Sequence, residues 1–189
     1  MPRHSDPEVE GRILEAARKL WHKGGESALS MRAVAKAAGT NTPAVYRRFR
    51  NREEILRALV GHFQQELFKV LQPCGSLQEL SQAYLDFALR SRREYELLNS
   101  DLVPRVSKTR PNLDFAMARS SEWLGGGPGT HAILVFAIWA LAHGTAMLKL
   151  SGSVRDEDFP KMRAAFARAI DILVANEKEL RNKEQGIAT

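Results

Sequence analysis

The chain has 189 residues, of which 44% are hydrophobic and 26% are charged, the usual balance for a globular protein of one or two domains. Its single cysteine, Cys74, excludes an internal disulfide and a cysteine-based zinc site, and residues 1–8 lack the apolar core of a signal peptide. The net charge is +6, and residues 1–60 hold twelve Lys/Arg against seven Asp/Glu, or +5 of that total. A basic N-terminal segment before a nearly neutral body indicates that nucleic acid binds at one end only.

The first predicted helix has Asp6 as its N-cap and Pro7 in its first turn, and it runs to about His22. Its apolar side chains recur at helical spacing, so we expect this stripe to pack behind the elements that follow. The sequence Lys23-Gly24-Gly25 ends the helix.

A short helix, a turn and a second short helix are predicted next. Ser30 can cap the first helix, and Gly39 can adopt the left-handed backbone that ends it. Asn41 or Thr42 can cap the second helix, in whose first turn Pro43 is tolerated because no intrahelical bond is lost there. The sequence therefore predicts a helix-turn-helix and the start of a third helix within the stretch Leu29–Leu56.

The outward face of the second short helix favours DNA as its partner. Val45 and Phe49 lie four residues apart and point inward, which leaves hydroxyl, phenol and guanidinium groups outside, on Thr42, Tyr46, Arg47 and Arg50. In a helix-turn-helix the second helix enters the major groove of DNA, where arginine can bind guanine and hydroxyls can bind phosphate.

This segment resembles the DNA-binding domain of the TetR/AcrR family of transcriptional repressors over about fifty residues. The shared pattern is Ala38-Gly39, then Tyr46-Arg47-Arg48-Phe49, then Arg52-Glu53-Glu54; Thr40 departs from it, because the family usually has an apolar residue there. The candidate DNA-binding residues of this helix-turn-helix are Ser30, Arg32, Asn41, Thr42, Pro43, Ala44, Tyr46, Arg47 and Arg52. The resemblance makes Arg52 a phosphate contact, and the alternative is a solvated surface arginine.

A long helix is predicted to connect this DNA-binding segment, which we call the head, to the rest of the chain. Asn51 and Glu54 form a capping box at its start, and apolar residues carry it to about Gln72. Pro73-Cys74-Gly75 then ends this helix. Ser76 and Glu79 form a second capping box, which begins a further helix that runs to about Asn99.

Four more helices are predicted after residue 100, at about 101–106, 112–124, 130–151 and 158–181. The fold class is therefore all-α, with about nine helices. We expect a DNA-binding domain at residues 1–60, a helical regulatory and dimerisation domain at 61–182, and a polar tail at 183–189. The glycine-rich stretch 125–129 lacks the ending of a phosphate-binding loop, so we interpret it as a connector.

The helix at 130–151 carries no charge between Glu122 and Lys149. A membrane span is the alternative, but the glycine loop and His143-Gly144-Thr145 interrupt the apolar run, so we expect no membrane association. A helix that is apolar on all sides is buried on all sides. Resemblance to the family implies a homodimer through the last two helices, in which a second subunit covers the outer face.

Trp139, His143 and Gly144 resemble a motif found in one group of TetR-family regulatory domains. The resemblance implies an inducer pocket among the middle helices, and candidate lining residues are Tyr84, Phe87, Tyr95, Trp123, Trp139 and His143. The alternative is that these side chains form ordinary core. A pocket of this composition would suit a small apolar or aromatic ligand.

We therefore interpret the chain as a cytoplasmic, ligand-responsive repressor that binds a palindromic double-stranded DNA operator as a homodimer and is released by a small-molecule inducer. A DNA-binding regulator or activator without an inducer is the alternative. We expect no cofactor, no metal site and no enzymatic activity, because the five histidines are scattered and no nucleophile motif is present.

Overall fold

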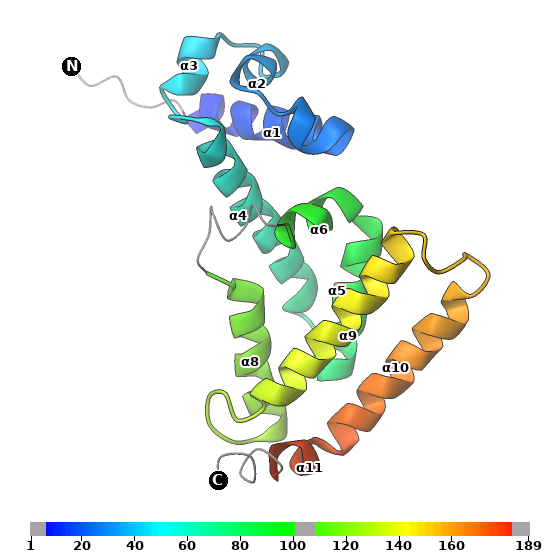
Figure 1. Cartoon of the computed structure of the whole chain (residues 1–189). Helices are drawn as coiled ribbons and strands as arrows, with labels where there is room; N and C mark the ends of the chain where they lie inside the picture. Colours follow the sequence, from blue (N-terminus) through cyan, green and yellow to red (C-terminus); the bar gives the residue numbers. More distant parts are fainter. Residues whose placement is uncertain (1–6, 101–108, 183–189) are drawn as a thin grey trace, which may run out of the picture. The chain divides into compact units, whose positions relative to one another are not determined.

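The computed structural model describes residues 7–100 and 109–182 (Figure 1). Within those ranges the chain is entirely helical, with ten α-helices and one short 3-10 helix, η1, which confirms the all-α prediction. The helices are α1 (Pro7–Gly24), η1 (Gly25–Ala28), α2 (Met31–Ala37), α3 (Thr42–Tyr46), α4 (Arg52–Leu71), α5 (Leu77–Arg90), α6 (Arg92–Leu98), α8 (Pro111–Leu124), α9 (Ala132–Leu150), α10 (Phe159–Ala175) and α11 (Glu177–Asn182). The predicted Asp6 cap, the helix at 101–106 and the tail at 183–189 lie outside the described residues.

The chain divides into two compact units. The first runs to Gln65 and includes the segment that begins at Arg93, whereas the second contains Glu66–Arg92 and the residues from Arg110 onward. Helix α4 crosses the division, so it belongs to both units.

The first unit is built around one apolar core. Helices α1 to α4 supply most of it, and α6 adds Leu97. Its fully or nearly fully buried members include Ile13, Ala17, Val34, Val45, Phe49, Ile55, Leu59 and Phe63. The apolar stripe predicted for α1 does lie in this core, which holds the helix-turn-helix against α1 and α4.

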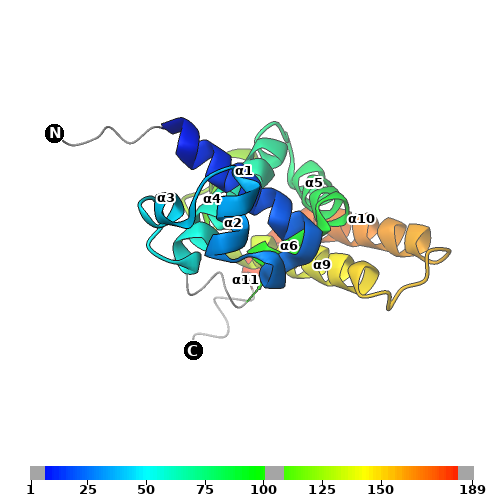
Figure 2. The same cartoon turned by 90° about the horizontal axis from the view of Figure 1, so that it is seen from above.

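In the second unit, α9 packs against α5, α10, α8 and α11. Both views show α9 and α10 side by side over much of their length (Figures 1 and 2). Phe68 of α4 meets Phe115 of α8 edge to face, with ring centroids 5.0 Å apart.

Two predicted helices are broken in the structure. The helix expected over 76–99 ends at Arg90, and α6 begins at Arg92, because α6 packs into the first unit instead of continuing α5. There the indole Nε1 of Trp21 donates a hydrogen bond of 3.0 Å to the carbonyl of Arg93, and Nε2 of His22 lies 2.5 Å from the carboxylate of the buried Glu94. The last predicted helix breaks at Asn176, whose side-chain amide donates to the Ile172 carbonyl at 2.8 Å.

That second break brings Glu177 to a buried histidine. Nδ1 of His131 lies 2.7 Å from the Glu177 carboxylate, and Nε2 lies 2.6 Å from the carbonyl of Gly125. Both side chains are at least nine-tenths buried. Each ring nitrogen therefore faces an oxygen that can accept a hydrogen bond from it. This pair ties the glycine-rich loop and the start of α9 to α11.

Glu177→Ala is expected to lower the free energy of unfolding by about 3 kcal/mol, because it leaves a buried imidazole without its carboxylate partner. Thermal and urea denaturation measure this loss. Glu179→Ala removes an exposed carboxylate from the same helix and serves as the matched control. Equal stability of the two variants would show that the His131–Glu177 pair contributes nothing to the fold.

Candidate nucleic-acid interface

Helix α2 begins as the sequence predicts. The Ser30 hydroxyl accepts a hydrogen bond of 3.1 Å from the backbone N–H of Ala33, which satisfies one of the unpaired donors of the first turn. Met31, Val34 and Ala35 are buried, whereas Arg32 and Lys36 are exposed. The helix therefore keeps its basic side chains on the solvent side.

The turn and the start of α3 are also as predicted. Gly39 has φ of +65°, the left-handed region that side chains rarely adopt. Of the two predicted caps for α3, Asn41 is the one used: its Oδ1 accepts from the Ala44 N–H at 2.9 Å. Pro43 lies in the first turn, as expected.

The outer face of α3 presents Tyr46, an aromatic side chain that is 52% exposed, beside the exposed Arg47. Asn41 and Pro43 are exposed as well, and Thr42 is half-buried. Val45 and Phe49 point into the core, as predicted. Within one capped helix and its flanks, this surface presents the guanidinium of Arg47, a phenol and an amide, which can bind base edges and phosphates.

Two members of the predicted contact set lie differently. Ala44 is buried beside Val45, so its methyl group is on the core side of α3 and we remove it from the proposed contacts. Arg52 is only partly exposed, and its guanidinium points toward Glu26 of η1 and toward Leu29, which directly follows η1.

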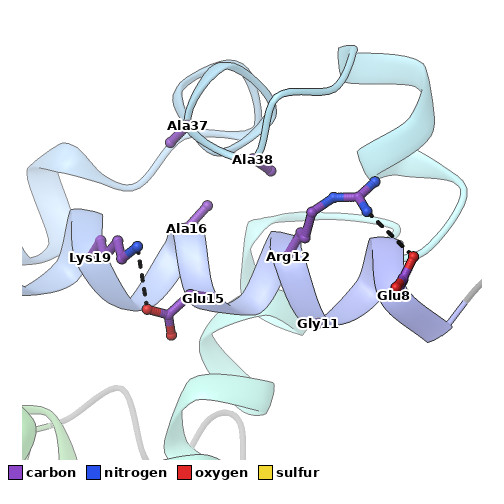
Figure 3. A pocket seen from close by; sticks show the side chains of 8 residues that line it. All are labelled: Glu8, Gly11, Arg12, Glu15, Ala16, Lys19, Ala37 and Ala38. Carbon is purple, nitrogen blue, oxygen red and sulfur yellow. Dashed lines mark ion pairs between the residues drawn. The ribbon is translucent and has the colours of Figure 1, made fainter.

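A surface groove of about 440 Å³ lies between α5 and α10 in the second unit, and another, of about 540 Å³, lies between α1 and α2 in the first (Figure 3). The α1–α2 groove has a floor of small residues between charged side chains, which pair along α1: Arg12 with Glu8, and Lys19 with Glu15. The hydrogen bond from Arg18, together with the nearby positive charges, lowers the pKa of Glu15 to about 2. Because the charges compensate one another, this groove is not a basic channel for DNA.

The predicted ligand-binding residues are only partly brought together. In the second unit, Trp139 Nε1 donates a hydrogen bond of 3.2 Å to the Tyr84 hydroxyl, and the Arg110 guanidinium lies 5.9 Å from the Trp139 ring centroid. Phe87 is buried, and burial of the half-buried His143 lowers its pKa. Sequence reasoning missed Arg110, because nothing in its neighbourhood along the chain connects it with a tryptophan 29 positions away.

Trp123 and Tyr95 lie elsewhere. Trp123 stacks with Arg119 of its own helix, at 4.6 Å from guanidinium carbon to ring centroid. Tyr95 is fully buried and belongs to the first unit with α6, so the structure does not group it with Tyr84 and Trp139. Sequence reasoning groups Tyr95 with them because the sequence pattern predicts one helix that continues through Ser91.

Comparison with known proteins agrees with this architecture. The family model described as bacterial regulatory proteins, tetR family, matches residues 13–59, and the model for a tetracyclin repressor-like C-terminal domain matches residues 77–173. The chain belongs to the TetR family. Its head is the family's DNA-binding domain, and the protein is a DNA-binding transcriptional regulator and not an enzyme.

Several solved structures share the fold. A protein of unknown function from Rhodococcus is 21% identical, with a TM-score of 0.68, over 90% of this chain and 96% of that chain. A TetR variant from Acinetobacter baumannii, in complex with minocycline, is 24% identical, with a TM-score of 0.64, over 91% and 97%. A putative transcriptional regulator from Streptomyces coelicolor is 25% identical, with a TM-score of 0.58, over 88% and 98%. No curated protein sequence matches the chain.

Proposed function

We propose that the protein is a repressor that binds a two-fold symmetric DNA operator and is released by a small apolar or aromatic inducer. The observation that carries the DNA part is the capped α2–turn–α3 unit with its exposed Tyr46 and Arg47. The contacts we propose are Ser30, Arg32, Asn41, Thr42, Pro43, Tyr46 and Arg47. Arg47 and Tyr46 would reach bases or phosphates, and Ser30 and Thr42 would position the head on the backbone.

The proposed dimer forms through α9 and α10. Helix α9 keeps several large apolar side chains exposed, and Ile172 of α10 is exposed as well. We call these residues the apolar face: Phe136, Leu141, Met147, Leu148 and Ile172, each 38–51% exposed. Among the described residues, α9 is also the one helix whose length and composition would suffice to span a membrane, and 33% of that stretch is buried. A second subunit on the apolar face would bury it and place two recognition helices about one DNA turn, ~34 Å, apart or somewhat further.

The proposed inducer site surrounds Tyr84 and Trp139. These two aromatic rings and Arg110 supply stacking surfaces and polar groups in one place, and the uncharged form of His143 is favoured by its partial burial. Such a site suits a planar, largely apolar ligand with an acceptor group. The minocycline complex of the Acinetobacter TetR variant supports a planar, polycyclic inducer, since that protein has the same fold.

We propose that ligand binding reaches the head through α4, which belongs to both units, and we place the functional domain boundary near residue 60 in this helix. The ligand would favour one conformation only through a difference in its affinity for the two conformations. The released form would present the two heads at a spacing that no longer fits the operator. In this account the protein acts in the cytoplasm, where operator DNA and inducer are both available.

A thermal-shift screen of planar apolar, flexible apolar and highly polar compounds tests the inducer proposal. We expect stabilisation by planar apolar compounds, release of operator DNA by the same compounds, and loss of both effects in Trp139→Ala. Trp123→Ala serves as the control, because Trp123 packs on Arg119 of its own helix. Stabilisation by highly polar metabolites alone would refute an apolar inducer, and no stabilisation by any class would favour a regulator without an inducer.

A further inference from the structure

Arg52, the first residue of α4, makes a set of contacts that a surface phosphate-binding arginine would not make. Its Nε donates a hydrogen bond of 2.8 Å to the carbonyl of Leu29, and one terminal nitrogen donates, also at 2.8 Å, to the carbonyl of Glu26. The same nitrogen lies 3.1 Å from the Glu26 carboxylate. One guanidinium therefore binds both ends of the short segment 26–29.

That segment controls where α2 begins. Leu29 directly precedes Ser30, the N-cap of α2, and the N–H of Leu29 bonds back to the Glu26 carbonyl at 3.2 Å. Arg52 thus closes the turn that leads into α2 and ties it to the first turn of α4. The planar fork of an arginine suits this arrangement, because it can bind two carbonyls and a carboxylate in fixed geometry.

These contacts also reduce what Arg52 can offer to DNA. Its Nε and one terminal nitrogen are directed at protein oxygens, and the Glu26 carboxylate offsets its charge. We propose that Arg52 is a positioning residue, which sets the start of α2 relative to the start of α4 and so holds the recognition surface of α2 and α3 in one geometry. This inference rests on the proposed operator binding and replaces the phosphate contact implied by family resemblance.

Three quantities separate positioning from phosphate contact: affinity for the selected operator, affinity for random DNA, and the dependence of each on salt. Arg52→Ala is expected to lower operator affinity on the order of tenfold, the effect of losing charge-assisted hydrogen bonds. Affinity for random DNA and the slope of log K against log salt should stay at the wild-type values, because no phosphate contact is lost. Arg52→Lys should not restore operator affinity, since an ammonium group cannot bridge the two carbonyls.

The partner residue gives a second readout. If Arg52 acts through the 26–29 segment, Glu26→Gln should lower operator affinity less than Arg52→Ala does. The binding free energy lost by the double variant should then be smaller than the sum of the losses in the two single variants. Arg90→Ala, an exposed arginine at the end of α5, is the control for the lost charge.

A salt slope that falls by about one unit in Arg52→Ala, with affinity restored by Arg52→Lys, would overturn the proposal in favour of a phosphate contact. If Arg52→Ala lowers the affinity for operator and for random DNA by the same factor and also lowers the melting temperature, the proposal is overturned in favour of a general folding role. If wild-type protein selects no operator at all, the proposed function fails as well. If wild-type protein selects an operator and Arg52→Ala keeps the wild-type ratio of operator affinity to random-DNA affinity, only the Arg52 proposal is overturned.

Discussion

Arg47→Ala is expected to weaken operator binding by about 1–3 kcal/mol, the range for losing a bidentate arginine–guanine contact. Arg47 is exposed at the C-terminal end of α3, next to the exposed Tyr46, while Val45 and Phe49 hold the helix to the core from the other side. The substitution therefore removes a surface group without disturbing the fold. Competition binding to operators varied at one base pair at a time measures both the loss and the change in preference.

The pattern of the loss shows what Arg47 contacts. If it contacts a base, discrimination should relax at one position in each half-site. If it contacts only phosphate, binding should weaken evenly across sequences and the salt slope should fall by about one unit. Arg90→Ala removes the same charge far along the chain and should change neither quantity. Full operator affinity in Arg47→Ala would contradict the proposed recognition face.

Phe136→Asp is expected to convert the protein to a monomer at concentrations where wild type is dimeric. Phe136 is 48% exposed in the single chain and belongs to the apolar face, so the proposed dimer would bury it. Burying an unpaired carboxylate costs several kcal/mol, which corresponds to at least about a hundredfold weaker association. Sedimentation measures the oligomeric state directly.

Because Phe136→Asp prevents dimerisation, it should also lower operator affinity, since a single head lacks the contribution of the second half-site. Leu124→Asp introduces the same charge at another large side chain, 39% exposed at the end of α8, and should leave the dimer intact. A dimer that survives Phe136→Asp but dissociates in Leu124→Asp would place the interface elsewhere in the second unit.

The head could be predicted from sequence nearly residue by residue, because its signals are local. Caps such as Ser30 and Asn41, and the turn glycine Gly39, act on backbone groups within three or four positions, so spacing along the chain determines the structure. Glu54 shows the limit of such rules. Its N–H is capped by Asn51 as expected, but its carboxylate accepts from the N–H of Arg50, at 2.7 Å, and not from Asn51.

The body could be predicted as a set of helices but not as a site. Helix α6 follows α5 after one residue, and nothing in its own pattern shows that Leu97 joins the core of the head. The pairs His131–Glu177 and Arg110–Trp139 join positions 46 and 29 residues apart. Arg52 illustrates the same difficulty in the head, because its partners Glu26 and Leu29 are more than twenty residues earlier. Such contacts depend on tertiary packing, which residue spacing does not encode.

Selection of DNA from a random duplex library by the purified full-length protein tests the central claim most directly. We predict enrichment of one two-fold symmetric sequence whose half-sites are about one helical turn apart or somewhat further, with affinity that falls steeply as salt rises. Repeating the selection with compounds that stabilise the protein should abolish the enrichment. Binding without any enriched sequence, or affinity that does not change with salt, would contradict a sequence-specific regulator that reads DNA through α3.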